Sequence, residues 1–276
     1  MRKVHLIPNA ITAFGLSCGL FMIFKVILDD LSLGLYAMTH ASVMLLLLAA
    51  LADLLDGAVA RIMHAESEFG VLFDSLADAV SFGVAPSVLL LKSLHLELGS
   101  GLAIFAIIGC MLFSLCGILR LVRFNIKANE AKNDPSLLIM HKKHFTGLPI
   151  PAAALTAAST NLLLVSPFIE RSGWISEEWR SILLPCVMIV LGFFMISRWK
   201  FPSIKVLQFR VPSFYLACAT ALIALLILYG IFYFFFFVVF VICWGYVVLG
   251  WVLSLIRLLA GKKSTTLEDF EPEDEE

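Results

Sequence analysis

DLLDGAVAR at residues 53–61 and GVLFDSLAD at residues 70–78 carry four aspartates through otherwise apolar sequence. On insertion scales a charged side chain at the centre of a bilayer costs roughly 2.5–3.5 kcal/mol, so four of them in one short stretch need compensating partners. Bound cations are the simplest such partners. We therefore interpret the two segments as a functional site built into a membrane protein.

The composition of the whole chain supports the same class. Of its 276 residues, 61% are hydrophobic and only 15% are charged, and the mean hydropathy is +0.96. Soluble domains have far less apolar and far more charged sequence. The expected fold class is an all-α integral membrane protein, because helices satisfy their own backbone hydrogen bonds in lipid.

About 20 apolar residues are needed to cross the hydrocarbon core, and the chain divides into about eight such stretches. We expect transmembrane helices at residues 9–28, 34–60, 70–93, 101–124, 149–168, 181–198, 212–229 and 231–256. The last two are nearly continuous, so six or seven crossings remain open. Residues 1–262 are expected to form one transmembrane catalytic domain, and residues 263–276 a disordered, acidic cytoplasmic tail.

Basic residues are distributed unevenly between the two sides of this topology. All but four of the 20 Lys and Arg residues fall on the side that holds both termini; the four are Lys25, Lys92, Arg171 and Arg180. Because Lys and Arg accumulate in cytoplasmic loops, we expect both termini and the acidic site to face the cytoplasm. The expected location is the cytoplasmic (inner) membrane.

The helical spacing of the four aspartates places their carboxylates in two pairs. Asp53 and Asp56 are three residues apart and Asp74 and Asp78 four apart, so each pair shares one face of its helix. A short turn at residues 64–67 would make the two helices antiparallel neighbours. So many like charges would repel one another unless cations neutralised them, and oxygen donors without His or Cys favour Mg²⁺ or Mn²⁺.

The residues beside the carboxylates leave room for a phosphorylated ligand. Gly57 has no side chain and Ala60 almost none, while the Arg61 guanidinium matches phosphate oxygens. Such a site suggests phosphoryl-type transfer, in which a spare carboxylate takes a proton from an attacking hydroxyl. Two alternatives remain: carboxylates paired with basic residues of other helices, or an ion-coupled transporter. A transporter predicts a counterpart cluster or broken helices in the second half, and the sequence has neither.

The aspartate run resembles the signature of the CDP-alcohol phosphotransferases, integral membrane enzymes that make phospholipids, at every fixed position. The resemblance implies a two-metal site of Mg²⁺ or Mn²⁺ with Asp53, Asp56 and Asp74 as principal ligands. It implies that Asp78 is a further metal ligand or the general base. It also implies that CDP-diacylglycerol binds beside Gly57, Ala60, Arg61 and Gly70.

Other stretches resemble the serine-accepting branch of that family, the bacterial and archaeal phosphatidylserine synthases. They are PNAIT (8–12), SLADAVSFGVAP (75–86), RLVRFN (120–125) and FTGLPIPA (145–152). This resemblance implies transfer of a phosphatidyl group from CDP-diacylglycerol to the hydroxyl of L-serine with release of CMP, by a homodimer among membrane lipids. Another acceptor on the same fold, chiefly glycerol 3-phosphate, remains an alternative.

Several further residues have two interpretations each. Asn9 and Thr12 can offer an amide and a hydroxyl to the CDP-diacylglycerol nucleotide, or Asn9 can simply cap the first span. Arg120 and Arg123 can hold a substrate carboxylate or phosphate, or anchor their helix at the interface. Ser81 and Asn125 are weaker candidates for the acceptor pocket. The Gly15-x3-Gly19 pattern permits close helix packing, within the chain or between two copies.

Overall fold

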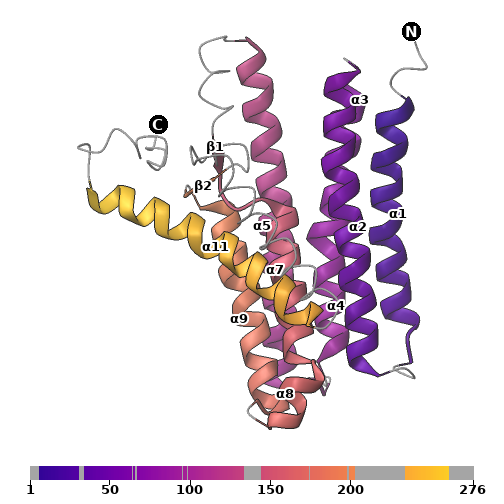
Figure 1. Cartoon of the computed structure of the whole chain (residues 1–276), viewed down its shortest axis with the longest axis vertical. Helices are drawn as coiled ribbons and strands as arrows, with labels where there is room; N and C mark the ends of the chain where they lie inside the picture. The colour runs from indigo at the N-terminus through magenta and orange to yellow at the C-terminus, as the bar shows by residue number, and fades with distance from the viewer. Residues whose placement is uncertain are drawn as a thin grey trace, which may run out of the picture. The chain divides into compact units, whose positions relative to one another are not determined.

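The computed structural model describes residues 6–30, 34–63, 65, 67–94, 96–97, 99–133, 144–173, 175–197, 199–202 and 234–260. These residues are almost entirely helical (Figure 1). The elements are α1 (Leu6–Leu28), α2 (Leu35–Ile62), α3 (Glu68–Asp78), the π-helix η1 (Ala79–Val84), α4 (Ala85–Ser93), α5 (Gly101–Asn133), β1 (His144–Thr146), α7 (Ile150–Leu164), α8 (Pro167–Ser172), α9 (Glu177–Ile196), β2 (Lys200–Pro202) and α11 (Phe235–Ala260).

Within the described residues, seven helical segments are long and apolar enough to cross a membrane. They are Leu6–Leu28, Leu35–Ile62, Glu68–Ser93, Gly101–Ile126, Ile150–Ser172, Glu177–Ile196 and Phe235–Ile256. Each corresponds to one of the eight predicted spans, and the remaining prediction, 212–229, lies outside the described residues. The predicted all-α membrane fold is confirmed, with one small addition: β1 and β2 pair antiparallel over three residues each.

The chain divides into two compact units. The first contains Met1–Ile126 and Pro149–Ile196, and the second Lys127–Leu148 and Ser197–Glu276. In the second unit the Gly147 N–H donates to the Trp199 carbonyl at 2.8 Å beside the β1–β2 pair, and the rings of Trp199 and Trp251 lie 6.4 Å apart. The predicted boundary between residues 262 and 263 lies outside the described residues and stays a prediction.

Helix α1 organises the first unit by packing along both α2 and α3. Figure 1 shows α1 and α2 side by side along the bundle. A Cβ added at Gly15 would lie 3.2 Å from the Ala52 side chain, and one added at Gly19 would meet Ser81. The two glycines therefore permit packing within the chain. Helices α2 and α3, expected to be direct neighbours, both pack against α1 and make few contacts with each other.

The third span is not the single helix predicted for residues 70–93. Helix α3 begins at Glu68, where the Ser67 side chain caps it by accepting the Gly70 N–H at 3.0 Å. Directly after Asp78 the backbone widens into the π-helix η1 and then continues as α4. The Ser114 hydroxyl of α5 donates to the Gly83 carbonyl at 2.8 Å within this segment. π-Helical turns inside longer helices occur frequently at functional sites.

Helix α7 forms much of the core, and it contacts α2, α4 and α9. Small residues on it are almost fully buried, so neighbouring helices can approach closely; they are Ala153, Ala154, Ala157 and Ala158. Polar groups tie one end of this core together. The Arg180 Nη2 of α9 donates to the Ser93 carbonyl at the end of α4, and Ser93 Oγ donates to Asn161 Oδ1 of α7 at 3.1 Å.

Candidate active site

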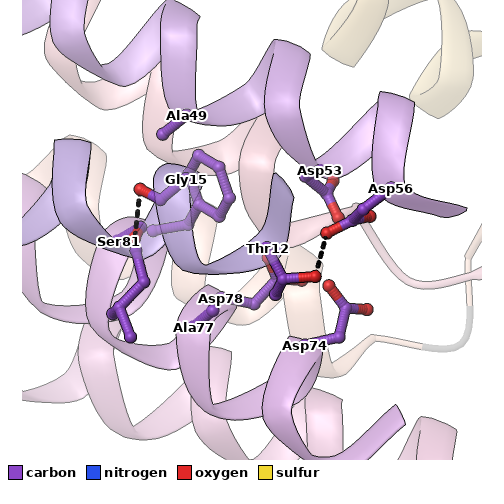
Figure 2. Close-up of a pocket in the computed structure, with 11 residues that line it drawn as sticks. Thr12, Gly15, Ala49, Asp53, Asp56, Asp74, Ala77, Asp78 and Ser81 are labelled. Atoms are coloured by element: carbon purple, nitrogen blue, oxygen red, sulfur yellow. Dashed lines mark hydrogen bonds between the residues drawn. The ribbon is translucent and has the colours of Figure 1, made fainter. Parts of the chain in front are cut away.

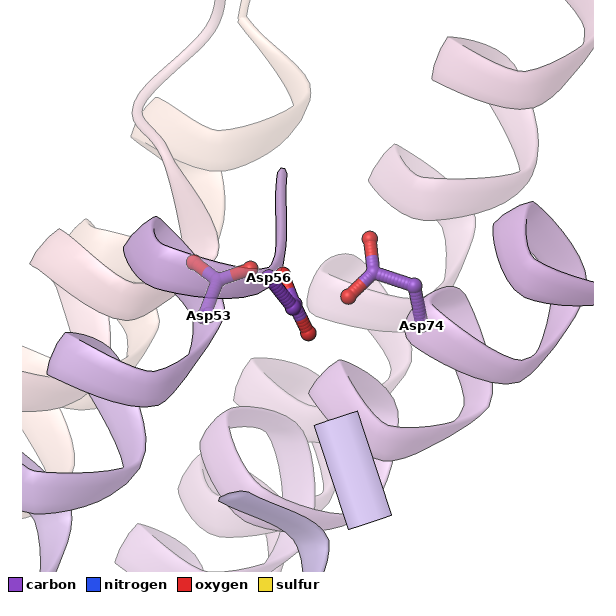
Figure 3. Close-up of side chains that lie close together, drawn as sticks. All are labelled: Asp53, Asp56 and Asp74. Carbon is purple, nitrogen blue, oxygen red and sulfur yellow. The ribbon is translucent and has the colours of Figure 1, made fainter. Parts of the chain in front are cut away.

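Three of the predicted carboxylates meet between the C-terminal part of α2 and the middle of α3. One oxygen from each of Asp53, Asp56 and Asp74 lies within 4.8 Å of the other two. Figure 3 shows Asp74 facing the other pair from its own helix. The spacing within α2 puts Asp53 and Asp56 on one face, and the packing of α1 against both helices brings Asp74 to them.

The fourth carboxylate, Asp78, lies one turn further along α3 and lines the same pocket (Figure 2). It interacts electrostatically with the three other aspartates and with Arg120 of α5. Asp78 is not part of the close triad, although it interacts with each of its members. The pocket is lined by Thr12, Gly15, Leu16, Ala49, Asp53, Asp56, Asp74, Ala77, Asp78, Ser81 and Phe82.

The triad fits a divalent cation. The triad oxygens lie within 4.8 Å of one another, and two unit charges at that limit repel each other by about 3.5 kcal/mol at an effective dielectric constant of 20; a cation would reverse the sign of this energy. All donors are carboxylate oxygens, the ligands of hard cations such as Mg²⁺ and Mn²⁺. Two oxygens on one Mg²⁺ are at most about 4.2 Å apart, twice its bond length, so small side-chain rotations would close the triad.

Helix α1 contributes a polar group directly to the cluster. The Thr12 Oγ1 lies 2.5 Å from Asp56 Oδ2 and 3.1 Å from the Pro8 carbonyl oxygen of its own helix. Figure 2 shows the hydroxyl pointing toward Asp56. Thr12, predicted as a nucleotide contact, therefore contacts a carboxylate.

Asn9 and Gly70, both predicted to bind CDP-diacylglycerol, lie together although they belong to α1 and α3. A Cβ added at Gly70 would lie 3.2 Å from Asn9 Oδ1 and 3.1 Å from Ser67 Oγ. Ser67 was not among the predicted site residues. The sequence signal that could have found it is a serine directly before an apolar helix, the usual place of an N-cap.

The last turns of α2 present the remaining donor-site candidates. Gly57 is exposed, with nothing within 4 Å of the position of an added Cβ. Arg61 is exposed in the last turn of α2, and Ala60 beside it is partly exposed. The open space predicted at Gly57 is therefore present next to the carboxylates, with an arginine one turn away.

The predicted acceptor residues occupy different positions. Ser81 is buried in the pocket wall, where its hydroxyl donates to the Gly15 carbonyl at 3.4 Å. Arg120 interacts with Asp78. Arg123 Nη1 donates to the carbonyl of Ile196, the last residue of α9, at 3.2 Å. Asn125 Nδ2 donates to Ser75 Oγ at 2.9 Å, between the two carboxylates of α3.

Of the four acceptor candidates, Ser81 thus lines the pocket together with Asp78 and Arg120 interacts electrostatically with Asp78, whereas Arg123 and Asn125 connect α5 to other helices. Helix-end carbonyls carry partial negative charge, which explains why a cation at position 123 docks on α9.

The chain is similar to known membrane transferases over most of its length. The family described as CDP-alcohol phosphatidyltransferase matches residues 5–194. A protein of Helicobacter pylori named CDP-diacylglycerol–serine O-phosphatidyltransferase is 32% identical over 220 residues, which cover 78% of this chain and 80% of that protein. Proteins with the same name in Methanocaldococcus jannaschii and Bacillus subtilis are 38% and 31% identical over 170 and 202 residues.

The alignments with these two proteins cover 62% and 73% of this chain and 68% and 93% of theirs. The relatives are transferases, which gives the transporter alternative no support. The matched residues 5–194 include α1, the acid triad, Asp78 and the whole of α7. This chain therefore belongs to the CDP-alcohol phosphatidyltransferase family of integral membrane proteins.

Proposed function

We propose that this protein is a phosphatidylserine synthase, which transfers the phosphatidyl group of CDP-diacylglycerol to the hydroxyl of L-serine and releases CMP. The observation that carries the proposal is the juxtaposition of a carboxylate triad with a separate carboxylate, Asp78, in one pocket. The relatives from bacteria and an archaeon, all named for this reaction, support the choice of acceptor.

In this reaction the serine hydroxyl oxygen forms a bond to the phosphorus that carries the diacylglycerol. The bond from that phosphorus to the CMP oxygen breaks, and CMP leaves with the bonding electrons. Asp78 accepts the hydroxyl proton as general base, because it lines the pocket without belonging to the close triad. Arg120, which interacts with Asp78, attracts the serine carboxylate.

Asp53, Asp56 and Asp74 would hold Mg²⁺ or Mn²⁺, with Asp78 able to contribute to a second ion. A divalent cation bound there would neutralise the charge of the diphosphate and of departing CMP. On the donor side, the open surface at Gly57 and Ala60 admits the nucleotide, and Arg61 binds the diphosphate. Asn9 and Gly70, which lie together, extend this surface onto α1 and α3.

The topology belongs to the proposal as well. The distribution of basic residues supports a chain in the cytoplasmic membrane with both termini and the pocket on the cytoplasmic side. A single cysteine introduced at Ser67, against Gly70 at the start of α3, is expected to react with a membrane-impermeant thiol reagent in inside-out but not right-side-out vesicles, in a background without native cysteines. The opposite pattern would invert the topology. Crosslinking in native membranes tests the homodimer.

The proposed function is tested with purified protein in detergent, CDP-diacylglycerol, Mn²⁺ or Mg²⁺, and one alcohol at a time, by measuring CMP release. We expect release that requires both L-serine and the metal. Release with glycerol 3-phosphate alone would keep the chemistry and overturn the acceptor, and no release with any alcohol would overturn the function.

The role of Asp78 has its own test. Asp78→Asn should abolish turnover while CDP-diacylglycerol still binds, because the amide cannot accept the proton. Ser17→Ala is a control, since among the described residues the Ser17 hydroxyl bonds to the Ala13 carbonyl of its own helix, on the exposed side of α1. Turnover at the normal rate in Asp78→Asn would remove Asp78 from the role of base.

A further inference from the structure

The contact between Thr12 and Asp56 joins two buried groups from different helices. Thr12 is 7% exposed and Asp56 is 5% exposed. A threonine hydroxyl has one proton to donate, and its two acceptors are Asp56 Oδ2 at 2.5 Å and the Pro8 carbonyl at 3.1 Å. The carboxylate is both closer and charged, so it receives the proton in a short, charge-assisted hydrogen bond.

Asp56 depends on this donor more than its neighbours do. Asp53 and Asp74 are partly exposed and can turn toward water, whereas Asp56 is buried. With two other carboxylates within 4.8 Å, electrostatic repulsion favours rotation of the Asp56 side chain away from the cluster. The Thr12 hydroxyl opposes this rotation by holding one oxygen in place.

The position of Thr12 is fixed by contacts that do not involve its own hydroxyl. One turn further along α1, Gly15 packs against Ala52, which lies one turn before Asp56 on α2. Two turns along α1, Gly19 packs against Ser81. The register of α1 on α2 therefore places the hydroxyl opposite Asp56 before any ligand binds.

We propose that Thr12 is a positioning residue that orients Asp56 for divalent-cation binding. The inference rests on the proposed metal site and deepens it, because it assigns part of the metal affinity to a helix without a carboxylate. Hydrogen-bond partners of metal-ligating side chains fix ligand orientation, and their removal typically lowers metal affinity by about 10–100-fold.

The experiment measures Mn²⁺ binding to the full-length protein in detergent by electron paramagnetic resonance, without CDP-diacylglycerol or serine. Thr12→Val keeps the side-chain shape and removes the hydroxyl, Thr12→Ser keeps the hydroxyl, and Thr12→Ala removes it without any risk of steric clash. Thr39→Val is the matched control. Thr39 is also buried, and its hydroxyl bonds to the Leu35 carbonyl four residues earlier at 2.8 Å.

We expect Thr12→Val and Thr12→Ala to weaken Mn²⁺ binding at least tenfold, with Thr12→Ser and Thr39→Val within about threefold of the parent. Parent-like Mn²⁺ affinity in a folded Thr12→Val or Thr12→Ala protein would overturn the inference, as would a raised KM for CDP-diacylglycerol without any change in Mn²⁺ affinity. If Asp74→Asn, like the Thr12 variants, binds Mn²⁺ with the affinity of the parent, the proposed metal site is wrong. If Asp74→Asn loses Mn²⁺ binding and the Thr12 variants keep it, only the proposed role of Thr12 is wrong.

Discussion

The substitution Gly19→Ala tests whether α1 must lie directly on η1. A Cβ at this position would lie 2.7 Å from Cβ and 2.8 Å from Cα of Ser81. Ordinary contact begins at 3.4 Å, so α1 and η1 would have to separate by at least 0.7 Å. Because one of the obstructing atoms belongs to the backbone, rotation of a side chain cannot relieve the clash.

Overpacking of this kind destabilises a protein by about 1–3 kcal/mol. Unfolding in mixed micelles of mild detergent and SDS, followed by circular dichroism, measures the loss. Gly245→Ala in α11 is the control, because nothing lies within 4 Å of an added Cβ there. It should be neutral or stabilising by up to about 1 kcal/mol, since alanine favours helix more than glycine does.

A second substitution separates the contributions of Ser81 Cβ and Cα. Ser81→Gly in the Gly19→Ala background removes the Cβ obstruction but not the Cα, so it should restore only part of the lost stability. If Gly19→Ala unfolds at the same SDS fraction as the parent, the close approach of α1 and η1 is wrong, and with it our account of how α1 positions the site.

Three other predictions follow from the site. Gly57→Ala should leave the unfolding midpoint unchanged, because an added Cβ meets nothing within 4 Å. It should nevertheless raise the KM for CDP-diacylglycerol in the CMP-release assay. A normal KM would show that Gly57 is not part of the donor-binding surface. Asp53→Asn should stabilise the metal-free protein, because it relieves charge repulsion. It should also lose the stabilisation of about 2.7 kcal/mol that Mn²⁺ at 100 times its Kd gives the parent protein. Thermal melts with and without EDTA measure both effects, and a rise in melting temperature with Mn²⁺ equal to that of the parent would contradict the ligand role. Asn125→Ala and Ser75→Ala should each lower stability, because the two side chains share one hydrogen bond of 2.9 Å. A double-mutant cycle should give a coupling energy of about 1 kcal/mol. Strictly additive effects would show that this bond does not stabilise the packing of α5 against α3.

Local sequence properties predicted most of the membrane fold. Hydropathy located the seven described spans within a few residues, because crossing lipid requires a continuous apolar helix whatever its neighbours are. The π-helix after Asp78 was not predicted; its contacts are with α1 and with the Ser114 hydroxyl of α5, which are distant in the sequence. The pairing of β1 with β2 likewise joins segments that are far apart in the sequence.

The carboxylate site was predicted in part for the same reason. Spacings of three and four residues put Asp53 with Asp56 and Asp74 with Asp78, since helical periodicity is a local property. The sequence could not show that Asp78 stands apart from the close triad, or that Arg120 interacts with Asp78 while Arg123 docks on α9. Residues three apart on one helix still face different neighbours, and only the packing determines which.

The sequence by itself determined that this is a helical membrane protein with an oxygen-rich acidic site and a family signature. Composition, hydropathy and residue spacing are local properties, so they can be read without knowing how the helices pack. Only the tertiary structure decided that α1 lies against both carboxylate-bearing helices and that Thr12 donates to Asp56. The physical reason is that this arrangement depends on how closely helices approach at Gly15 and Gly19. Such close approach depends on both of the helix surfaces that pack together, so it cannot be predicted from either segment alone.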